Sequence, residues 1–294
     1  MTPSDSRPRP RPEALEGLIA RATAADGSPP FSDGALIDPS HELTWLGPAA
    51  ALSNGTEAEF VVDPDARAHG HGTRMLEHLL AQGDTLFWAH GDHPAARALA
   101  ARHGLVAART LLHLERRGLS RPPAAVSKPD EVSLPTGTAA TPLRGASEPA
   151  RRGPRRWSAY STGDADAWLD LNARAFAHHP EQGGVTRADL DALTAEPWFD
   201  TDDFLLLWDG AELIGYSWMK VEGGEGEFYV VGVSPERQGE GLGRRLVEAG
   251  LARLASRGIR TAHLYVEGDN APALALYRSF GFTDRSVDIQ YKAG

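Results

Sequence analysis

The chain has 294 residues, of which 41% are hydrophobic and 24% charged, so it can form two globular domains that each bury a core. It contains no cysteine, which excludes disulfides, thiolate metal sites and a cysteine nucleophile. The net charge of −10 argues against a nucleic-acid partner, and no run approaches the roughly 18 apolar residues of a membrane span.

The first residues, MTPSDSRPRPRP, are basic and proline-rich, and no apolar stretch follows them. A secretory signal needs such a stretch, so we interpret this segment as the disordered tail of a cytoplasmic protein. Composition and charge together predict a monomeric enzyme that acts on a small molecule, with no nucleic-acid or membrane partner.

A proline-rich segment divides the chain. Residues 120–154 hold seven of the 21 prolines and almost no large apolar residue. Such a segment cannot bury enough surface to fold, which predicts a semi-rigid linker. The predicted organisation is therefore a domain at 1–119, a linker at 120–154 and a domain at 155–294.

The second half alternates between strand-like and helix-like segments. Asp209-Gly210 separates two apolar runs and predicts a hairpin, while Gly258 suits a helix C-terminus and Asn270 a helix N-cap. We expect helices at 164–177, 186–195, 241–257 and 271–280. Strands are expected near 157–161, at 203–208, 211–222, 226–233 and 259–266, and near 282–292. This order predicts an α/β domain with a mixed sheet.

The two halves share one plan. Pro64, Gly70 and Gly72 correspond to Pro235, Gly241 and Gly243 at a constant offset of 171 residues. Further along, residues 91–93 and 104–105 correspond to 268–270 and 281–282 at an offset of 177. Because the matched glycines keep their order and spacing, we predict a tandem repeat of one domain.

A glycine-rich loop at 238–244 lies between a strand and an amphipathic helix of the second half. Glycines allow close approach of the backbone to a ligand, and the amides at a helix start can hold an anion such as a pyrophosphate. The Rossmann fingerprint fits poorly, because its order is Gly-x-Gly-x-x-Gly after an early strand. Here the order is Gln238-x-x-Gly241-x-Gly243 after a late one.

This loop, together with Val231-Gly232-Val233 before it and the segment from Asn270 to Phe282 after it, resembles the acetyl-CoA motifs of the GNAT superfamily. The resemblance implies two tandem GNAT-type domains, each with a mixed, mostly antiparallel sheet flanked by helices, and acetyl-CoA as co-substrate. It implies that the pantetheine arm pairs with Val231, Gly232 and Val233. The pyrophosphate would be held by Gln238, Gly239, Glu240, Gly241, Leu242, Gly243 and Arg244. The thiol end would be flanked by Asn270, Ala271, Pro272, Ala273, Leu274 and Ala275.

Acetyl transfer from a thioester to an amine needs a base for the amine, a donor for the oxyanion and a proton for the leaving thiolate. Glu227 opens the strand that carries Val231 and is the candidate base, with Glu225 as its rival. A backbone amide near Val231 is the candidate oxyanion donor. Tyr277 matches a position where many GNAT enzymes keep a tyrosine, and Tyr265 lies on the preceding strand, so both are candidate acids.

The first half lacks these groups. Where the second half has Tyr277, Tyr265 and Glu227, the first half has Ala100, Trp88 and Thr56. It therefore keeps the glycines without the candidate acid and base, which predicts a degenerate, non-catalytic copy. The resemblance implies that this copy still holds acetyl-CoA through Phe60, Val61, Val62, Ala68, His69, Gly70, His71, Gly72 and Thr73.

Peptides that the general fold does not require resemble one GNAT family, mycothiol synthase. They are residues 87–91, 179–184, 198–200, 227–233, 264–267 and 286–288. Membership implies acetylation of the cysteinyl amine of cysteinyl-glucosaminyl-inositol, the last step of mycothiol biosynthesis. It implies Glu227 as base and Tyr265 as acid. The implied substrate contacts are Asp33, Glu181, Lys220, Glu227 and Tyr265.

Two alternatives belong to other classes. Six of the 11 histidines lie between His69 and His103, which raises a metal-binding or regulatory first half. No carboxylate spacing completes a recognisable site, so we expect no metal. The other alternative is a GNAT enzyme that acts on a different small amine or on a protein N-terminus.

Overall fold

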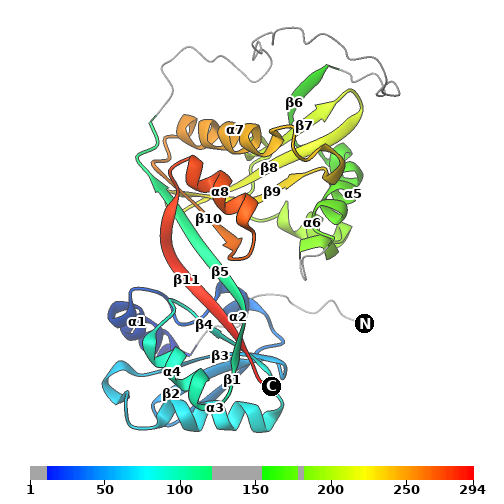
Figure 1. Cartoon of the computed structure of the whole chain (residues 1–294). Coiled ribbons are helices and arrows are strands. Elements are labelled where there is room, and N and C mark those ends of the chain that lie inside the picture. The colour runs from blue at the N-terminus through cyan, green and yellow to red at the C-terminus, as the bar shows by residue number, and fades with distance from the viewer. Residues whose placement is uncertain (1–11, 121–153, 178–181) are drawn as a thin grey trace. The chain divides into compact units, whose positions relative to one another are not determined.

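The computed structural model describes residues 12–120, 154–177 and 182–294 (Figure 1). These residues form two compact units. The first unit contains the chain up to Leu114 together with Val266–Ala271 and Asp284–Gly294, and the second contains Glu115–Tyr265 and Pro272–Thr283. This grouping differs from a division in chain order, because the last strand pairs inside the first unit. Most of the predicted linker lies outside the described residues.

The first unit is built on a mixed sheet. Strands β1 (Glu42–Leu46), β2 (Ala49–Ser53) and β3 (Glu57–Val62) pair antiparallel, β3 pairs in parallel with β4 (Leu86–Ala89), and β4 pairs antiparallel with the last strand β11 (Thr283–Lys292). The helices are α1 (Glu13–Asp26), α2 (Asp33–Ile37), α3 (His71–Gln82) and α4 (Pro94–Arg102), and β5 spans Val106–Arg117.

Strand alternation divides the core of the first unit between the two faces of its sheet. Ala50 and Leu52 of β2 pack with α1 and α2 on one face, while Ala49 and Ala51 pack with α3 on the other. Small alanines on β2 let the helices approach the sheet closely. Tyr291 of β11 belongs to the α3 cluster, so the C-terminal strand completes this core.

The second unit begins with β6 (Arg155–Ala159), α5 (Ala165–Ala175) and α6 (Arg187–Leu193). Strands β7 (Phe204–Asp209), β8 (Glu212–Glu222) and β9 (Glu225–Val233) follow, then α7 (Leu242–Ser256), β10 (Thr261–Glu267) and α8 (Ala271–Ser279). Strands β6 to β9 pair antiparallel in order, and β9 pairs in parallel with β10. The predicted α/β class, mixed sheet and Asp209-Gly210 hairpin are confirmed, with ends shifted by a few residues.

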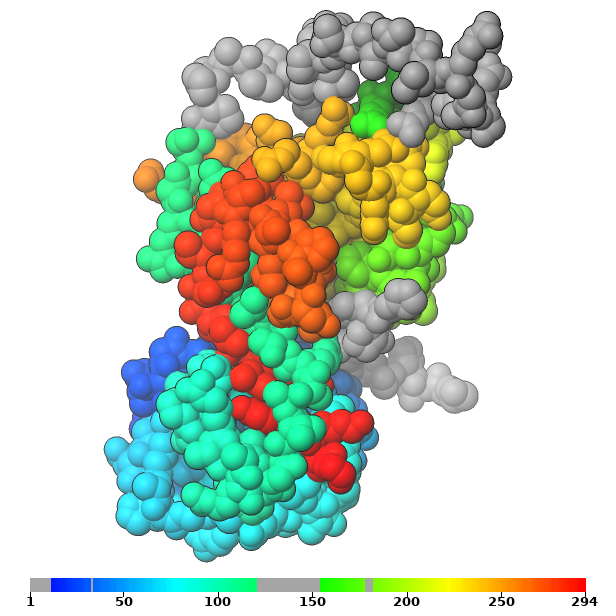
Figure 2. Space-filling model, in the orientation of Figure 1, coloured from blue at the N-terminus to red at the C-terminus, as the bar shows by residue number. Residues whose placement is uncertain are grey.

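Helices cover both faces of the second sheet (Figure 1). Phe204 and Leu206 of β7 pack with Trp168 and Leu171 of α5 on one face. Leu207 packs with Leu242 and Leu246 of α7 on the other. Helix α8 lies at the surface and has no fully buried residue (Figure 2). Among the described residues, no helix is long and apolar enough to cross a bilayer.

Candidate active site

Strands β9 and β10 diverge in the second unit. They pair in parallel at two positions, Gly226 with Ala262 and Glu227 with His263. Beyond this point β9 continues to Val233 and β10 to Glu267 without further paired positions in the described structure. The free edge of β9 can therefore accept an extended chain as an added strand, which suits the amide-bearing arm of acetyl-CoA. Val231, Gly232 and Val233 lie on this edge, as the prediction requires.

The candidate base lies where the divergence begins. Glu227 and Lys220 are directly opposite one another on β9 and β8, so their side chains share one face of the sheet. The register then shifts between Trp218 and Met219, which leaves Tyr229 without an opposite residue. Such an irregularity changes the direction of side chains beside an active site. The structure thus brings together Glu227 and Lys220, two predicted site residues.

Tyr229 belongs to the same cluster, although its role could not be inferred from the sequence. Its ring lies 5.3 Å from that of Trp198 and 5.4 Å from that of Trp218, and Lys220 Nζ lies 5.4 Å from the Trp198 ring centre. Burial raises the pKa of Tyr229, and the nearby charge of Glu227 raises it further. The aromatic residues and the two charges form one wall that can hold a polar ligand bearing an amine.

The predicted pyrophosphate loop leads directly into α7. Gly239 and Gly241 have φ values of +81° and +72°, a left-handed conformation that favours glycine. Gly241 is the N-cap of α7 and provides no side-chain cap. The first amides of the helix are therefore available to an anion, and the helix dipole adds positive potential there.

A buried ion cluster fixes this loop. Arg237 donates to Asp209 at 2.5 Å, to Glu240 at 2.9 Å and to Glu212 at 3.2 Å. Arg155 also pairs with Glu240. Hydrogen bonds from Glu240 and Asp209 raise the pKa of Arg237. The Glu240 side chain is thus neutralised by two arginines, and only its backbone fits the cofactor role predicted for it.

The two candidate acids differ in exposure. Tyr265 lies on β10 beyond the last pairing with β9, and 47% of its surface is exposed. Tyr277 lies on α8, with its ring 5.8 Å from that of Phe282. Burial raises the pKa of Tyr277 to about 12, which weakens it as a proton donor to a thiolate. Residues 270–275, predicted to flank the thiol end, form the entry to α8 and its first turns.

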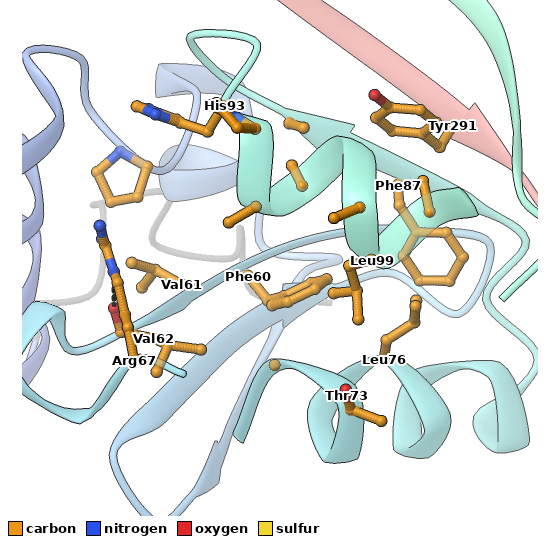
Figure 3. Close-up of a pocket in the computed structure, with 18 of the residues that line it drawn as sticks. Phe60, Val61, Val62, Arg67, Thr73, Leu76, Phe87, His93, Leu99 and Tyr291 are labelled. Carbon is orange, nitrogen blue, oxygen red and sulfur yellow. Dashed lines mark hydrogen bonds between the residues drawn. The ribbon is translucent and has the colours of Figure 1, made fainter. Parts of the chain in front are cut away.

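The first unit contains a cavity of about 580 Å³ at the corresponding place. Here β3 and β4 pair in parallel only from Glu57 to Glu59 and then diverge. Phe60, Leu76 and Leu99 point into the space between the sheet, α3 and α4 (Figure 3). The wall includes every residue predicted for cofactor binding in this half except His69: Phe60, Val61, Val62, Ala68, Gly70, His71, Gly72 and Thr73.

The loop of this cavity carries little free positive charge. Arg67 makes two hydrogen bonds to Asp26, at 2.6 and 2.7 Å, and Arg74 contacts His71 Nδ1 at 2.5 Å. Ala68 stands where the second half has Gly239 and keeps a positive φ of 64°. The backbone of the loop is therefore preserved across the repeat, while its side chains are already paired within the protein.

A buried charged triad lies beside the cavity. His90 Nε2 is 3.3 Å from Glu59 Oε2, and His90 Nδ1 is 3.1 Å from Asp288 Oδ2. The backbone N–H and hydroxyl of Ser32 donate to Glu59, and the N–H of Gly91 donates to Asp288. Burial alone would lower the pKa of His90, but the two carboxylates raise it to about 9. Because this triad joins β3, the end of β4 and β11, it could not be inferred from the spacing of residues in the sequence.

The triad makes the stability of the protein depend on pH. The pKa of His90 in the folded protein, about 9, lies above its ordinary value of 6.5. The stabilisation is therefore complete below about pH 6.5 and is lost as pH rises through about 9, an effect of up to about 3 kcal/mol. Urea denaturation at about pH 6 and pH 9.5 should show this fall in the wild type and a smaller one in His90→Gln. His78→Gln, outside the triad, should retain the full fall; an equal fall in His90→Gln would contradict the assignment.

Comparison with known proteins identifies the family. The chain is 42% identical to the mycothiol acetyltransferase of Clavibacter michiganensis subsp. michiganensis, over 98% of this chain and 94% of the relative. The chain belongs to the mycothiol acetyltransferase family. It is also 39% identical to the mycothiol acetyltransferase of Kocuria rhizophila, over 100% of this chain and 99% of that protein. Residues 166–282 match the acetyltransferase (GNAT) family, so this family member is an acetyl-CoA-dependent N-acetyltransferase.

Solved structures support the tandem GNAT fold. A GCN5-related N-acetyltransferase from Sphaerobacter thermophilus superposes with a TM-score of 0.70 at 18% identity, over 100% of this chain and 93% of that one. A tandem GNAT protein from the clavulanic acid biosynthesis pathway gives a TM-score of 0.57 at 18% identity, over 95% and 94% of the two chains. At this identity the likeness concerns the fold alone.

Two of the substrate contacts implied for this mycothiol acetyltransferase family member cannot be placed fully. Glu181 lies outside the described residues, and for Asp33 only the backbone position at the start of α2 is described. The histidine-rich first half was also a candidate metal module. Over residues 12–120, 154–177 and 182–294, no group of three or more His, Asp or Glu side chains is arranged to hold a metal ion. In the triad, the carboxylates face opposite nitrogens of His90 instead of converging.

Proposed function

We propose that this chain transfers the acetyl group of acetyl-CoA to the cysteinyl amine of cysteinyl-glucosaminyl-inositol, giving mycothiol. The observation that carries the proposal is the Lys220–Glu227 pair at the point where β9 and β10 diverge. It places a carboxylate and a cation next to the strand edge that suits the pantetheine arm. The match to mycothiol acetyltransferases over nearly the whole chain supports the identity of the acceptor.

In the proposed reaction, Glu227 takes a proton from the amine, whose nitrogen attacks the thioester carbon. A backbone amide near Val231 donates to the oxyanion of the tetrahedral intermediate. The carbon–sulfur bond then breaks, and Tyr265 gives its proton to the leaving thiolate. The greater exposure of Tyr265 and the raised pKa of Tyr277 favour this choice of acid.

We further propose that the two parts of the predicted repeat differ in role. The 155–294 domain carries the chemistry. The 1–119 domain holds acetyl-CoA in its 580 Å³ cavity without turning it over. The net charge of −10 supports a cytoplasmic, monomeric enzyme with no nucleic-acid or membrane partner.

The proposal is tested by measuring acetyl-CoA turnover with cysteinyl-glucosaminyl-inositol beside other small amines and a panel of peptides. We expect the pseudo-disaccharide to give the highest kcat/KM. A peptide N-terminus that exceeds it would replace the proposed acceptor, and turnover restricted to a different amine would do the same.

Substitution of the two tyrosines distinguishes the candidate acids. Tyr265→Phe should lower kcat while the affinity for acetyl-CoA stays close to that of the wild type. An acetyl donor with a more acidic thiol should partly restore the rate, because its thiolate leaves without a proton when departure limits turnover. Steady-state rates with both donors measure this. A wild-type rate in Tyr265→Phe, with a loss in Tyr277→Phe, would assign the role to Tyr277.

A further inference from the structure

A second hollow lies where β5 begins and β10 ends. It measures about 420 Å³, and we call it the Arg109 cleft. Its wall includes Ala107, Ala108, Arg109, Thr110, Glu267 and Asp269. None of these residues belongs to the acetyl-CoA or substrate contacts already described. The cleft is therefore available for a different part of a ligand.

An ion pair forms the polar side of the Arg109 cleft. Arg109 Nη2 lies 2.6 Å from Glu267 Oε1, and about three quarters of each side chain is buried, with 24% and 23% exposed. The Arg109 guanidinium also lies 5.4 Å from the centre of the Trp88 ring. Contacts on both sides hold the guanidinium in one orientation, so that its remaining donors and the second carboxylate oxygen keep fixed directions.

The charges of the Arg109 cleft define the class of ligand. One arginine and two carboxylates, Glu267 and Asp269, give a net charge of −1. A phosphate or carboxylate ligand would be repelled, whereas neighbouring hydroxyls can donate to the carboxylates and accept from the arginine. Ala107 and Ala108 are exposed and add a small apolar surface for the C–H face of a ring. This combination fits a neutral polyhydroxylated ring.

The turn that carries the two carboxylates is held rigidly. The N–H of Gly268 donates to the carbonyl of Thr110 at 2.7 Å. A Cβ at position 268 would lie 3.1 Å from Thr110 Cβ, so glycine permits this close approach. Glu267 and Asp269, on either side of Gly268, therefore have a fixed backbone position at the rim of the cleft.

The position of Glu267 relates the cleft to the reaction centre. Glu267 follows Tyr265 by two residues on β10, so both side chains leave the same face of the strand about 7 Å apart. An acceptor whose amine is near the catalytic groups would place a more distant ring at this separation. The hydroxyl-rich end of the proposed acceptor is such a ring.

We propose that the Arg109 cleft is the subsite for the inositol ring of the acceptor, with Arg109 and Glu267 as its specificity-determining residues. This inference rests on the proposed function, because it needs cysteinyl-glucosaminyl-inositol as the acceptor. It goes beyond that function by assigning a binding role to residues outside the acetyl-transfer site.

The test compares two acceptors in the full-length enzyme: cysteinyl-glucosaminyl-inositol and cysteinyl-glucosamine, which lacks the inositol. Arg109→Met and Glu267→Gln should each lower kcat/KM for the complete acceptor by about 10- to 100-fold, the range for a lost hydrogen bond to a charged group. For the shorter acceptor the change should be less than about threefold, and KM for acetyl-CoA should stay unchanged. Arg109→Lys keeps the charge without the fork geometry and should fall in between.

Arg97→Met is the matched control, because Arg97 also forms an ion pair in the first unit, with Asp92 at 2.9 Å, away from the cleft. It should behave as the wild type with both acceptors. Equal losses on the two acceptors in Arg109→Met and Glu267→Gln would show a purely structural role and overturn the subsite alone. If the wild type acetylates neither acceptor, the proposed function fails, and the subsite fails with it.

Discussion

Gly243→Leu is expected to reduce acetyl-CoA turnover by about 10²-fold or more, because the new side chain would occupy the space beside the first amides of α7 where the pyrophosphate is proposed to bind. The protein itself can accept the change. A Cβ at this position would lie 3.1 Å from Leu276 Cδ2, the flexible end of a side chain. Gly241 is less suitable, because its φ of +72° would add backbone strain to any substitution. Steady-state kinetics at varied acetyl-CoA concentration measure the loss.

The tandem repeat provides the control for this substitution. Gly72 matches Gly243 at the offset of 171 residues, and a Cβ there would lie 3.7 Å from side-chain atoms of Leu99 and Val62. Gly72→Leu should fill part of the first cavity and leave turnover measurable, because the proposed chemistry belongs to the second half. Losses of similar size in both variants, with unfolding curves like that of the wild type, would contradict an enzyme with one catalytic site.

Much of the second unit could be predicted because its signals are local. The Asp209-Gly210 turn set the hairpin of β7 and β8, and Gly210 has the positive φ, 60°, that such a turn needs. Gly258 follows the end of α7 with a φ of +80°. The repeat predicted the backbone of the first loop so well that Ala68 keeps the left-handed conformation of Gly239. In each case a single residue type specifies the local backbone.

Features that depend on distant contacts could not be predicted. The pairing of Ile289 with Ala89 joins β11 to β4 across 200 residues, and no local pattern specifies that partner. The Glu59–His90–Asp288 triad depends on the same pairing, because it places Asp288 next to His90. The sequence therefore indicated a first half without a base, yet that half contains a buried histidine held between two carboxylates.

The pyrophosphate loop shows a similar limit within the candidate site. Its glycines predicted a close approach to an anion, but the pattern could not show which way the Glu240 side chain points. The structure turns that carboxylate toward Arg237 and Arg155, which removes an unfavourable charge from the loop. The consequence is that two arginines outside the predicted motif allow an acidic residue inside it.

Glu227→Gln is expected to lower kcat/KM for the acceptor by about 10²- to 10⁴-fold, the range for loss of a general base. Glutamine keeps the size of the side chain and its place opposite Lys220 but cannot accept the proton. An α-amine has a pKa of about 8, so at higher pH the acceptor arrives neutral and needs less help. The defect should therefore shrink as the pH rises above about 8. Rates of wild type and variant across this range measure the effect.

Glu225→Gln is the matched control for this substitution. Glu225 leaves the same strand two residues earlier, but it lies opposite Glu222, whereas Glu227 lies opposite Lys220. Glu227 is also the carboxylate whose charge acts on the pKa of Tyr229 in the aromatic wall, where the amine is proposed to bind. We therefore expect Glu225→Gln to retain nearly the wild-type rate at every pH. A larger defect in Glu225→Gln would move the base to Glu225. A defect in Glu227→Gln that does not change with pH would instead show that Glu227 binds the acceptor without taking its proton.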